Sequence, residues 1–300
     1  MARATIDGIE TEYEVRGDGP PLLMFSPGGF DASMDKWWTL GIYAKTHPLD
    51  HLSQHYSCIL FDRRECGRSG GRVERVTWAD YARQGKGLLD HLGIDRAHLI
   101  GGCMGVSPVT VFATLYPGML RSMILYWPVG GARYRISGHQ RFADHLGFAN
   151  TQGLEAVVAL VKEGGKSFSG DPRGGPWASS IRTDPAFAEA YAKIDLADYR
   201  LIVAGMVRTL LDRDTAPGAE PEDLLRCRIP ALVIPGADAS HATSAARYRQ
   251  RRRVPNRRPS KSLRHPVFQG PASPQERVYP DTDPGSPHRA ALQLACLRAL

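Results

Sequence analysis

Residues 101–105 read Gly-Gly-Cys-Met-Gly and separate a short apolar run from a segment with helical spacing. Glycines on either side of Cys103 permit a sharp bend of the backbone between a strand and a helix. A cysteine at such a bend lies at a helix N-terminus, where backbone N–H groups and the helix dipole favour the thiolate. The pattern therefore predicts a strand–turn–helix unit, here called the elbow (101–105), that presents Cys103 as a nucleophile.

Strand-like and helix-like segments alternate along most of the chain. Residues 6–15 alternate between apolar and polar side chains, and helical spacing appears at 78–92 and 106–116. Continuous apolar runs, typical of strands buried on both faces, occur at 22–25, 56–61, 97–100, 122–127 and 229–234. This order predicts an α/β fold with a mostly parallel, doubly wound sheet, whose chemistry lies beyond the carboxyl ends of the strands.

The pattern changes between residues 132 and 211, where apolar positions have helical spacing and strand-like runs are absent. We expect this segment to be a helical lid, inserted in a sheet domain made of residues 1–131 and 212–246. Residues 247–300 form a third part with a different composition, considered below.

Composition narrows the class of protein. No run of 18 uncharged apolar residues occurs, and the first residues contain no apolar segment, so neither a transmembrane helix nor a secretory signal is expected. The five cysteines are an odd number without framework spacing, which favours free thiols and a cytoplasmic protein. No metal-binding spacing of cysteines or histidines occurs, and we expect no metal and no organic cofactor.

Several motifs resemble those of the α/β-hydrolase superfamily in type and order, over about residues 5–246. They are Gly-Asp-Gly-Pro-Pro at 17–21, Ser-Pro-Gly-Gly-Phe at 26–30, Asp-Arg-Arg-x-x-Gly-Arg-Ser at 62–69, the elbow, and Tyr-Pro-Gly-Met-Leu-Arg-Ser-Met-Ile-Leu at 116–125. The chain looks like a lid-bearing, esterase-like member with a cysteine in the nucleophile position. The resemblance implies the fold but no particular substrate, because this fold hosts many reactions.

Carried over to this sequence, the resemblance implies a set of site residues. Cys103 is the nucleophile, and the backbone N–H of Met104 is one donor of the oxyanion hole. The second donor is expected from Gly29 or Phe30. Pro27 departs from the superfamily, in which a histidine is common at this place, so the resemblance does not imply the shape of the oxyanion loop.

The resemblance further implies an acid and a base. Asp238, after the run 229–234, suits the acid that orients an imidazole, and His241 on the same rim is the favoured base. His265 and His288 are the alternatives, nearer the usual place of the histidine in the chain. Simpler interpretations stay open: a buried, inert thiol for Cys103, a turn residue or N-cap for Asp238, and a solvated loop residue for His241.

Residues 247–300 carry 12 Lys and Arg against 3 Asp and Glu, whereas the first 246 residues hold 26 basic and 28 acidic side chains. The net charge of +7 therefore belongs to this segment. It is interpreted as a disordered basic tail, as an arm for nucleic acid or a membrane surface, or as the product of a shifted reading frame. The abrupt end of the superfamily-like pattern near Tyr248 favours the shifted frame. The lack of interleaved aromatic residues argues against nucleic acid.

These observations predict an enzyme that hydrolyses a small ester, lactone or thioester through a thioacyl intermediate on Cys103. The expected partner is a small-molecule substrate, with no membrane; self-association stays open. Three alternatives remain: an inactive binding protein with the same fold, acyl transfer or C–C bond hydrolysis at the same site, and a nucleic-acid-associated protein acting through residues 247–264.

Overall fold

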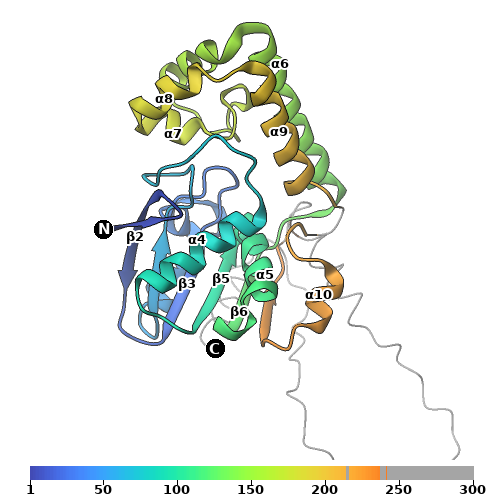
Figure 1. The fold of residues 1–300 in the computed structure, drawn as a ribbon. Helices are drawn as coiled ribbons and strands as arrows, with labels where there is room; N and C mark the ends of the chain where they lie inside the picture. Colours follow the sequence, from blue (N-terminus) through green and yellow to red (C-terminus); the bar gives the residue numbers. More distant parts are fainter. Residues whose placement is uncertain (214–215, 237–240, 242–300) are drawn as a thin grey trace, which may run out of the picture.

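The computed structural model describes residues 1–213, 216–236 and 241, and Figure 1 shows their arrangement. Asp238 and the whole segment 247–300 lie outside the described residues, so the expectations made for them are not addressed by the fold.

A single mixed sheet is the centre of the described structure. Its strands lie in the order β1-β2-β4-β3-β5-β6-β7, and every neighbouring pair from β4 to β7 is parallel. The two antiparallel pairs are β1–β2 and β2–β4, so β2 alone runs opposite to the other strands, next to the edge strand β1. The strands are β1 Ala2–Ile6, β2 Ile9–Arg16, β3 Pro21–Phe25, β4 Ser57–Phe61, β5 Ala97–Gly102, β6 Leu120–Tyr126 and β7 Ala231–Ile234. The α/β class with a mostly parallel sheet is confirmed.

Helices cover both faces of this sheet, which explains the continuous apolar runs. Leu23 and Phe25 of β3 face the cluster beneath α4 (Trp78–His91) and α5 (Val106–Leu115), whereas Leu22 and Met24 face the opposite cluster. That second cluster contains residues of three short helices, which are α1 (Lys36–Thr39), α2 (Gly41–Thr46) and α3 (Pro48–Leu52). Because side chains alternate between the two faces of a strand, a doubly covered strand must be apolar throughout.

Two local predictions differ from the structure. The alternating segment 6–15 is not one strand: Asp7 and Gly8 both have positive φ, 52° and 70°, and turn the chain so that Ile6 pairs with Ile9. Two consecutive residues with positive φ form the tight hairpin turn that matches the twist of antiparallel strands. The helices between residues 36 and 52 were not predicted, because four- to six-residue helices are too short to show a 3.6-residue period.

The chain between β6 and β7 contains no strand among its described residues and is dominated by helices. Four of them lie together at one end of the sheet in Figure 1. They are α6 Gly131–Gly164, α7 Ala178–Thr183, α8 Pro185–Ala192 and α9 Leu196–Leu210. We call residues 131–210 the helical segment. No helix of the described part has the length and apolar content required to cross a bilayer.

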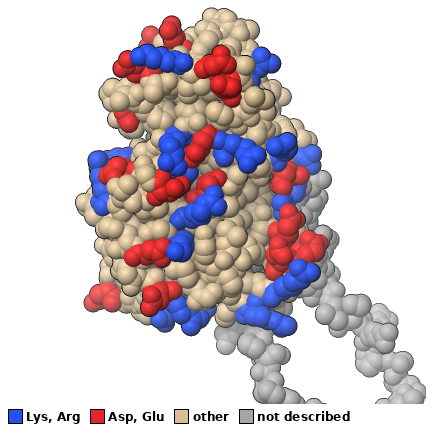
Figure 2. All heavy atoms as spheres, in the orientation of Figure 1, with Lys and Arg blue, Asp and Glu red and all other residues tan. Residues whose placement is uncertain are grey.

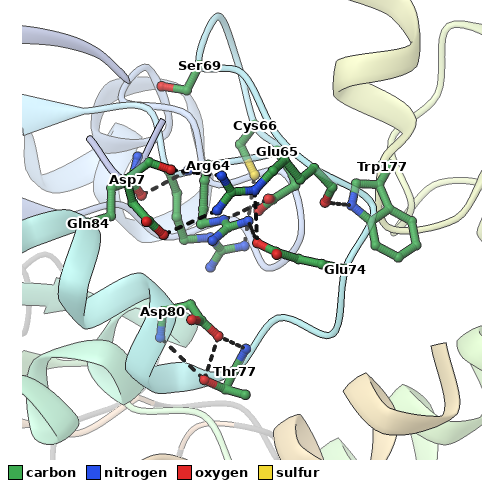
Figure 3. A network of polar contacts seen from close by, with 12 residues as sticks. Asp7, Arg64, Glu65, Cys66, Ser69, Glu74, Thr77, Asp80, Gln84 and Trp177 are labelled. Carbon is green, nitrogen blue, oxygen red and sulfur yellow. Dashed lines mark hydrogen bonds and ion pairs between the residues drawn. The ribbon is translucent and has the colours of Figure 1, made fainter. Parts of the chain in front are cut away.

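Helix α4 begins with a reciprocal cap that Figure 3 shows. The Thr77 hydroxyl accepts a hydrogen bond from the Asp80 N–H, and the Asp80 carboxylate accepts one from the Thr77 N–H at 2.7 Å. These bonds satisfy backbone donors that the first turn of a helix leaves without partners.

Replacing Thr77 with alanine should lower the free energy of unfolding by about 1 kcal/mol, because the Asp80 N–H loses its acceptor. Urea denaturation of the variant beside Thr77→Ser, which keeps the hydroxyl, measures the effect. Equal destabilisation in both variants would assign the loss to the methyl group instead of the cap.

Candidate active site

Cys103 lies at the sharp bend between β5 and α5. Its φ is 52°, in the left-handed region that residues other than glycine rarely adopt, and a single 3₁₀ turn, Cys103–Gly105, leads directly into α5. Such backbone strain costs of the order of 1–3 kcal/mol and persists where the surrounding structure enforces it. The side chain is partly buried. The geometry is that of an elbow holding a thiol beyond the carboxyl end of a parallel strand.

The neighbouring glycines enforce this bend through close backbone contacts. A Cβ added to Gly105 would lie 2.3 Å from the Phe25 carbonyl oxygen, and one added to Gly101 would lie 2.4 Å from the Gly105 carbonyl oxygen. Real Cβ atoms do not approach backbone oxygens so closely. The elbow therefore packs directly on the end of β3, where the next loop of the site begins.

His241 is the imidazole that the structure places beside the thiol. Its Nε2 lies 3.4 Å from Cys103 Sγ, within hydrogen-bond range for sulfur. The ring also packs against Trp127, with the ring centroids 5.2 Å apart. Of the histidines considered from sequence, His265 and His288 lie outside the described residues, as does Asp238, the expected acid.

The loop after β3 approaches the elbow from the other side. The Asp31 N–H donates to the Gly28 carbonyl at 3.0 Å, which closes a tight turn with Gly29 and Phe30 at its centre. Gly29 has a φ of 65°, and a Cβ built on it would lie 4.0 Å from Met104 Sδ. The three residues expected to form an oxyanion hole, Gly29, Phe30 and Met104, therefore come from two adjoining turns. The Met104 N–H lies in the first helical turn, where an N–H has no intrahelical acceptor.

Two residues that the sequence did not assign to the site hold this loop. Arg63 Nη2 donates to the Gly29 carbonyl, and Cys66 Sγ donates to the Phe30 carbonyl at 3.3 Å. The charged residues next to Arg63 make other contacts. The ion pairs belong to Arg64, with Glu65 and Glu74 (Figure 3), whereas Asp62 accepts backbone N–H groups.

The helical segment contacts the same loop through aromatic rings. Phe30 packs edge to face on Phe142 and Phe168, with both centroid distances at 5.3 Å. Trp177 Nε1 donates to the Arg72 carbonyl at 3.0 Å, which attaches the segment to the loop that follows Cys66 (Figure 3). Because these contacts join residues more than 100 positions apart in the chain, no local pattern could have revealed them.

The electrostatic setting distinguishes the cysteines of the described chain, all four of which are free thiols. Burial raises the pKa of both the Cys58 and the Cys66 thiol to about 12, so these two stay protonated at neutral pH.

Within the described residues, no cluster of three His, Cys, Asp or Glu side chains could hold a metal ion. Figure 2 shows basic and acidic side chains interspersed on the visible face, without a broad patch of one sign.

Comparison with known proteins agrees with this geometry. The sequence model of a family described as having the alpha/beta hydrolase fold matches residues 21–130. A 2-hydroxy-6-oxo-6-phenylhexa-2,4-dienoate hydrolase of Comamonas testosteroni is 35% identical over 119 residues, 39% of this chain and 40% of that protein. The dihydrolipoyllysine-residue acetyltransferase component of the acetoin cleaving system of Cupriavidus necator is 29% identical over 161 residues, 53% of this chain and 39% of that protein. The match thus spans less than half the length of these curated relatives.

Solved structures share the fold over most of the chain. An alpha/beta hydrolase enzyme from a Medee basin deep-sea metagenome library has a TM-score of 0.54 at 16% identity, covering 83% of this chain and 85% of its own. A meta-cleavage product hydrolase of Pseudomonas fluorescens has a TM-score of 0.52 at 17% identity, with the same coverage. Together with the elbow and the sheet order, these matches show that the chain has the α/β-hydrolase fold, with the sequence pattern of that fold family over residues 21–130.

Proposed function

We propose that this protein hydrolyses a small carboxylic ester, lactone or thioester, with Cys103 as the nucleophile. The observation that carries the proposal is the 3.4 Å separation of Cys103 Sγ and His241 Nε2 at a strained elbow. A thiol needs an adjacent base to become a thiolate at neutral pH, and an imidazole at hydrogen-bond distance is such a base.

The first half of the reaction follows from this pair. His241 Nε2 takes the thiol proton, and the thiolate attacks the substrate carbonyl carbon, which places a negative charge on the carbonyl oxygen. The Met104 N–H and an N–H of the 29–30 turn stabilise that charge. The C–O or C–S bond to the leaving group then breaks, and the imidazolium returns the proton to the leaving group.

The second half restores the thiol. His241 accepts a proton from water as the water attacks the thioacyl carbon, and the same backbone donors stabilise the second oxyanion. Collapse of this intermediate breaks the C–S bond, releases the carboxylic acid and returns the proton to the Cys103 thiolate. Asp238 is assigned as the residue that orients the imidazole. The helical segment, whose Phe142 and Phe168 contact Phe30, acts as the lid over the acyl group.

The activities for which several relatives are named favour one second candidate. Proteins of Comamonas testosteroni and Burkholderia cepacia, 35% and 47% identical over their matched segments, are named as 2-hydroxy-6-oxo-6-phenylhexa-2,4-dienoate hydrolases. A dienoate of this kind is the alternative substrate, hydrolysed at a C–C bond by the same elbow. Side-by-side assays of that dienoate and of p-nitrophenyl butyrate, each at saturating concentration, separate the two candidates by their turnover.

A covalent adduct tests the proposal directly. After acid quenching of a reaction with p-nitrophenyl butyrate, we expect a butyryl group on the peptide that contains Cys103, released by neutral hydroxylamine as a thioester is. Iodoacetamide added beforehand should block both the adduct and turnover. An active enzyme whose Cys103 peptide remains unmodified throughout turnover would contradict the proposed nucleophile.

A further inference from the structure

The 29–30 turn is held from behind by two buried donors. Arg63 Nη2 donates to the Gly29 carbonyl, and Cys66 Sγ donates to the Phe30 carbonyl at 3.3 Å. Both donor residues are buried, at 3% and 1% exposure. Because burial keeps the Cys66 thiol protonated, with a pKa of about 12, its S–H stays available as a donor at neutral pH. Each central carbonyl of the turn therefore has a fixed partner on the side of residues 63–66.

The direction of the carbonyls sets the direction of the amide groups. In a trans peptide unit the C=O and the following N–H point in opposite directions across a planar bond. With the Gly29 carbonyl directed at Arg63, the Phe30 N–H points away from the 63–66 loop. None of the backbone hydrogen bonds of the described residues uses this N–H as a donor. It is thus an available donor on a turn that adjoins Met104.

Arg63 is suited to more than a mechanical role. Among the described ion pairs none includes Arg63, and its Nε and Nη1 have no hydrogen-bond partner there. The guanidinium lies over the Tyr81 ring, 4.2 Å from its centroid. A buried cation bonded to a carbonyl polarises the whole peptide unit, which makes the N–H at its other end a stronger donor. This effect is larger here than at the surface, since water does not screen the charge.

We propose that Arg63 is a positioning residue of the oxyanion hole, which fixes and polarises the Gly29–Phe30 peptide so that the Phe30 N–H donates to the developing oxyanion, with the Cys66 S–H fixing the next peptide. This inference rests on the proposed function and selects Phe30 over Gly29 as the second donor.

The test compares two buried arginines. Arg63→Met removes the bond to Gly29, whereas Arg64→Met, the matched control, removes ion pairs to Glu65 and Glu74 but no contact with the turn. For p-nitrophenyl butyrate we expect Arg63→Met to lower kcat about 10- to 100-fold, with KM changed less than threefold. Arg63→Lys, which keeps a cation, should recover part of the loss. Arg64→Met should keep kcat within threefold while lowering stability.

Alkylation of Cys103 by iodoacetamide separates this role from loss of structure. Alkylation of the thiol forms no oxyanion, so its rate should be the same in Arg63→Met as in the wild type. The fraction of protein that is alkylated measures how many molecules retain an intact Cys103 site. A slow ester reaction with undiminished alkylation supports the proposal. Parallel loss of both reactions, or equal kcat in Arg63→Met and Arg64→Met, would overturn it.

Cys66 supplies a milder pair of variants in case Arg63→Met does not fold. Cys66→Ser keeps a donor to the Phe30 carbonyl, and Cys66→Ala removes it with little change of volume. We expect kcat to fall severalfold in the alanine variant and to recover in the serine variant. If both variants retain wild-type kcat, the hydrogen bond from Cys66 to the Phe30 carbonyl is not required for catalysis. These outcomes assume activity through Cys103; an unmodified Cys103 peptide would refute the proposed function itself, before any arginine variant is compared.

Discussion

Replacing Cys103 with alanine should reduce turnover of p-nitrophenyl butyrate by about 10³-fold or more, because the variant has no group that can form the acyl intermediate. The oxyanion donors remain, so the residual rate should lie slightly above that of the uncatalysed reaction. Initial rates at several enzyme concentrations measure the effect, since true catalysis scales with enzyme. Wild-type rates that survive the substitution would place the chemistry elsewhere.

Stability measurements on the same position provide the control. Cys103 has a φ of 52°, and alanine retains the steric cost of that conformation, so Cys103→Ala should unfold at nearly the wild-type urea concentration. Glycine has no such cost, and Cys103→Gly should be more stable by about 1 kcal/mol while equally inactive. A gain of stability on loss of activity is expected where strain is retained for function. If the free energy of unfolding of Cys103→Gly equals that of the wild type, the bend at residue 103 does not store strain.

The parts of the site that the sequence predicted are those encoded locally. The elbow could be read from residues 101–105, because the glycine spacing, the preceding apolar run and the following helix are consecutive in the chain. The parallel sheet could be predicted for the same reason, since each strand carries its own apolar run. The catalytic roles of Cys103 and His241, the oxyanion-hole donors, the acid Asp238 and the lid remain proposals.

The parts that were missed depend on contacts across the chain. Arg63 reaches Gly29 over 34 positions, and Phe142 reaches Phe30 over more than 100, so neither contact has a sequence spacing to detect. Arg63 does not stand out in the sequence, because its neighbours Asp62 and Arg64 are also charged. A positively charged side chain in the core is informative only once its burial and its acceptor are known.

The helical segment contains a buried histidine that should make stability depend on pH. His145 is fully buried, its Nδ1 lies 2.8 Å from the Arg173 carbonyl, and its Nε2 contacts the Tyr199 hydroxyl. Since a carbonyl only accepts, Nδ1 carries the proton and Nε2 accepts from Tyr199, which in turn accepts from Tyr191 at 2.6 Å. This arrangement requires the neutral imidazole. Burial accordingly lowers the pKa of His145 from 6.5 to about 4.

The sign of the effect follows from proton binding. Between about pH 6.5 and 4 the unfolded chain binds a proton at His145 that the folded protein excludes, so stability falls as pH falls through this range. The shift corresponds to about 3 kcal/mol. Glu65 acts in the opposite direction: burial raises its pKa from 4.5 to about 7, so the folded protein binds the proton that the unfolded chain releases. Its contribution is lost as pH rises from about 4.5 through 7.

The pH ranges over which His145 and Glu65 act overlap, and their effects on stability have opposite signs. The free energy of unfolding of the wild type should therefore change less between pH 4.5 and 6.5 than it would with either group alone. Glu65→Gln should unmask His145 and give a free energy of unfolding that drops steeply on acidification. His145→Gln keeps a donor for the Arg173 carbonyl and an acceptor for Tyr199, and should instead lose stability as pH rises. Urea titrations at half-unit intervals measure all three slopes. Identical slopes in the wild type and Glu65→Gln would show that the Glu65 carboxyl has the same pKa in the folded and unfolded protein and does not contribute to the pH dependence of stability.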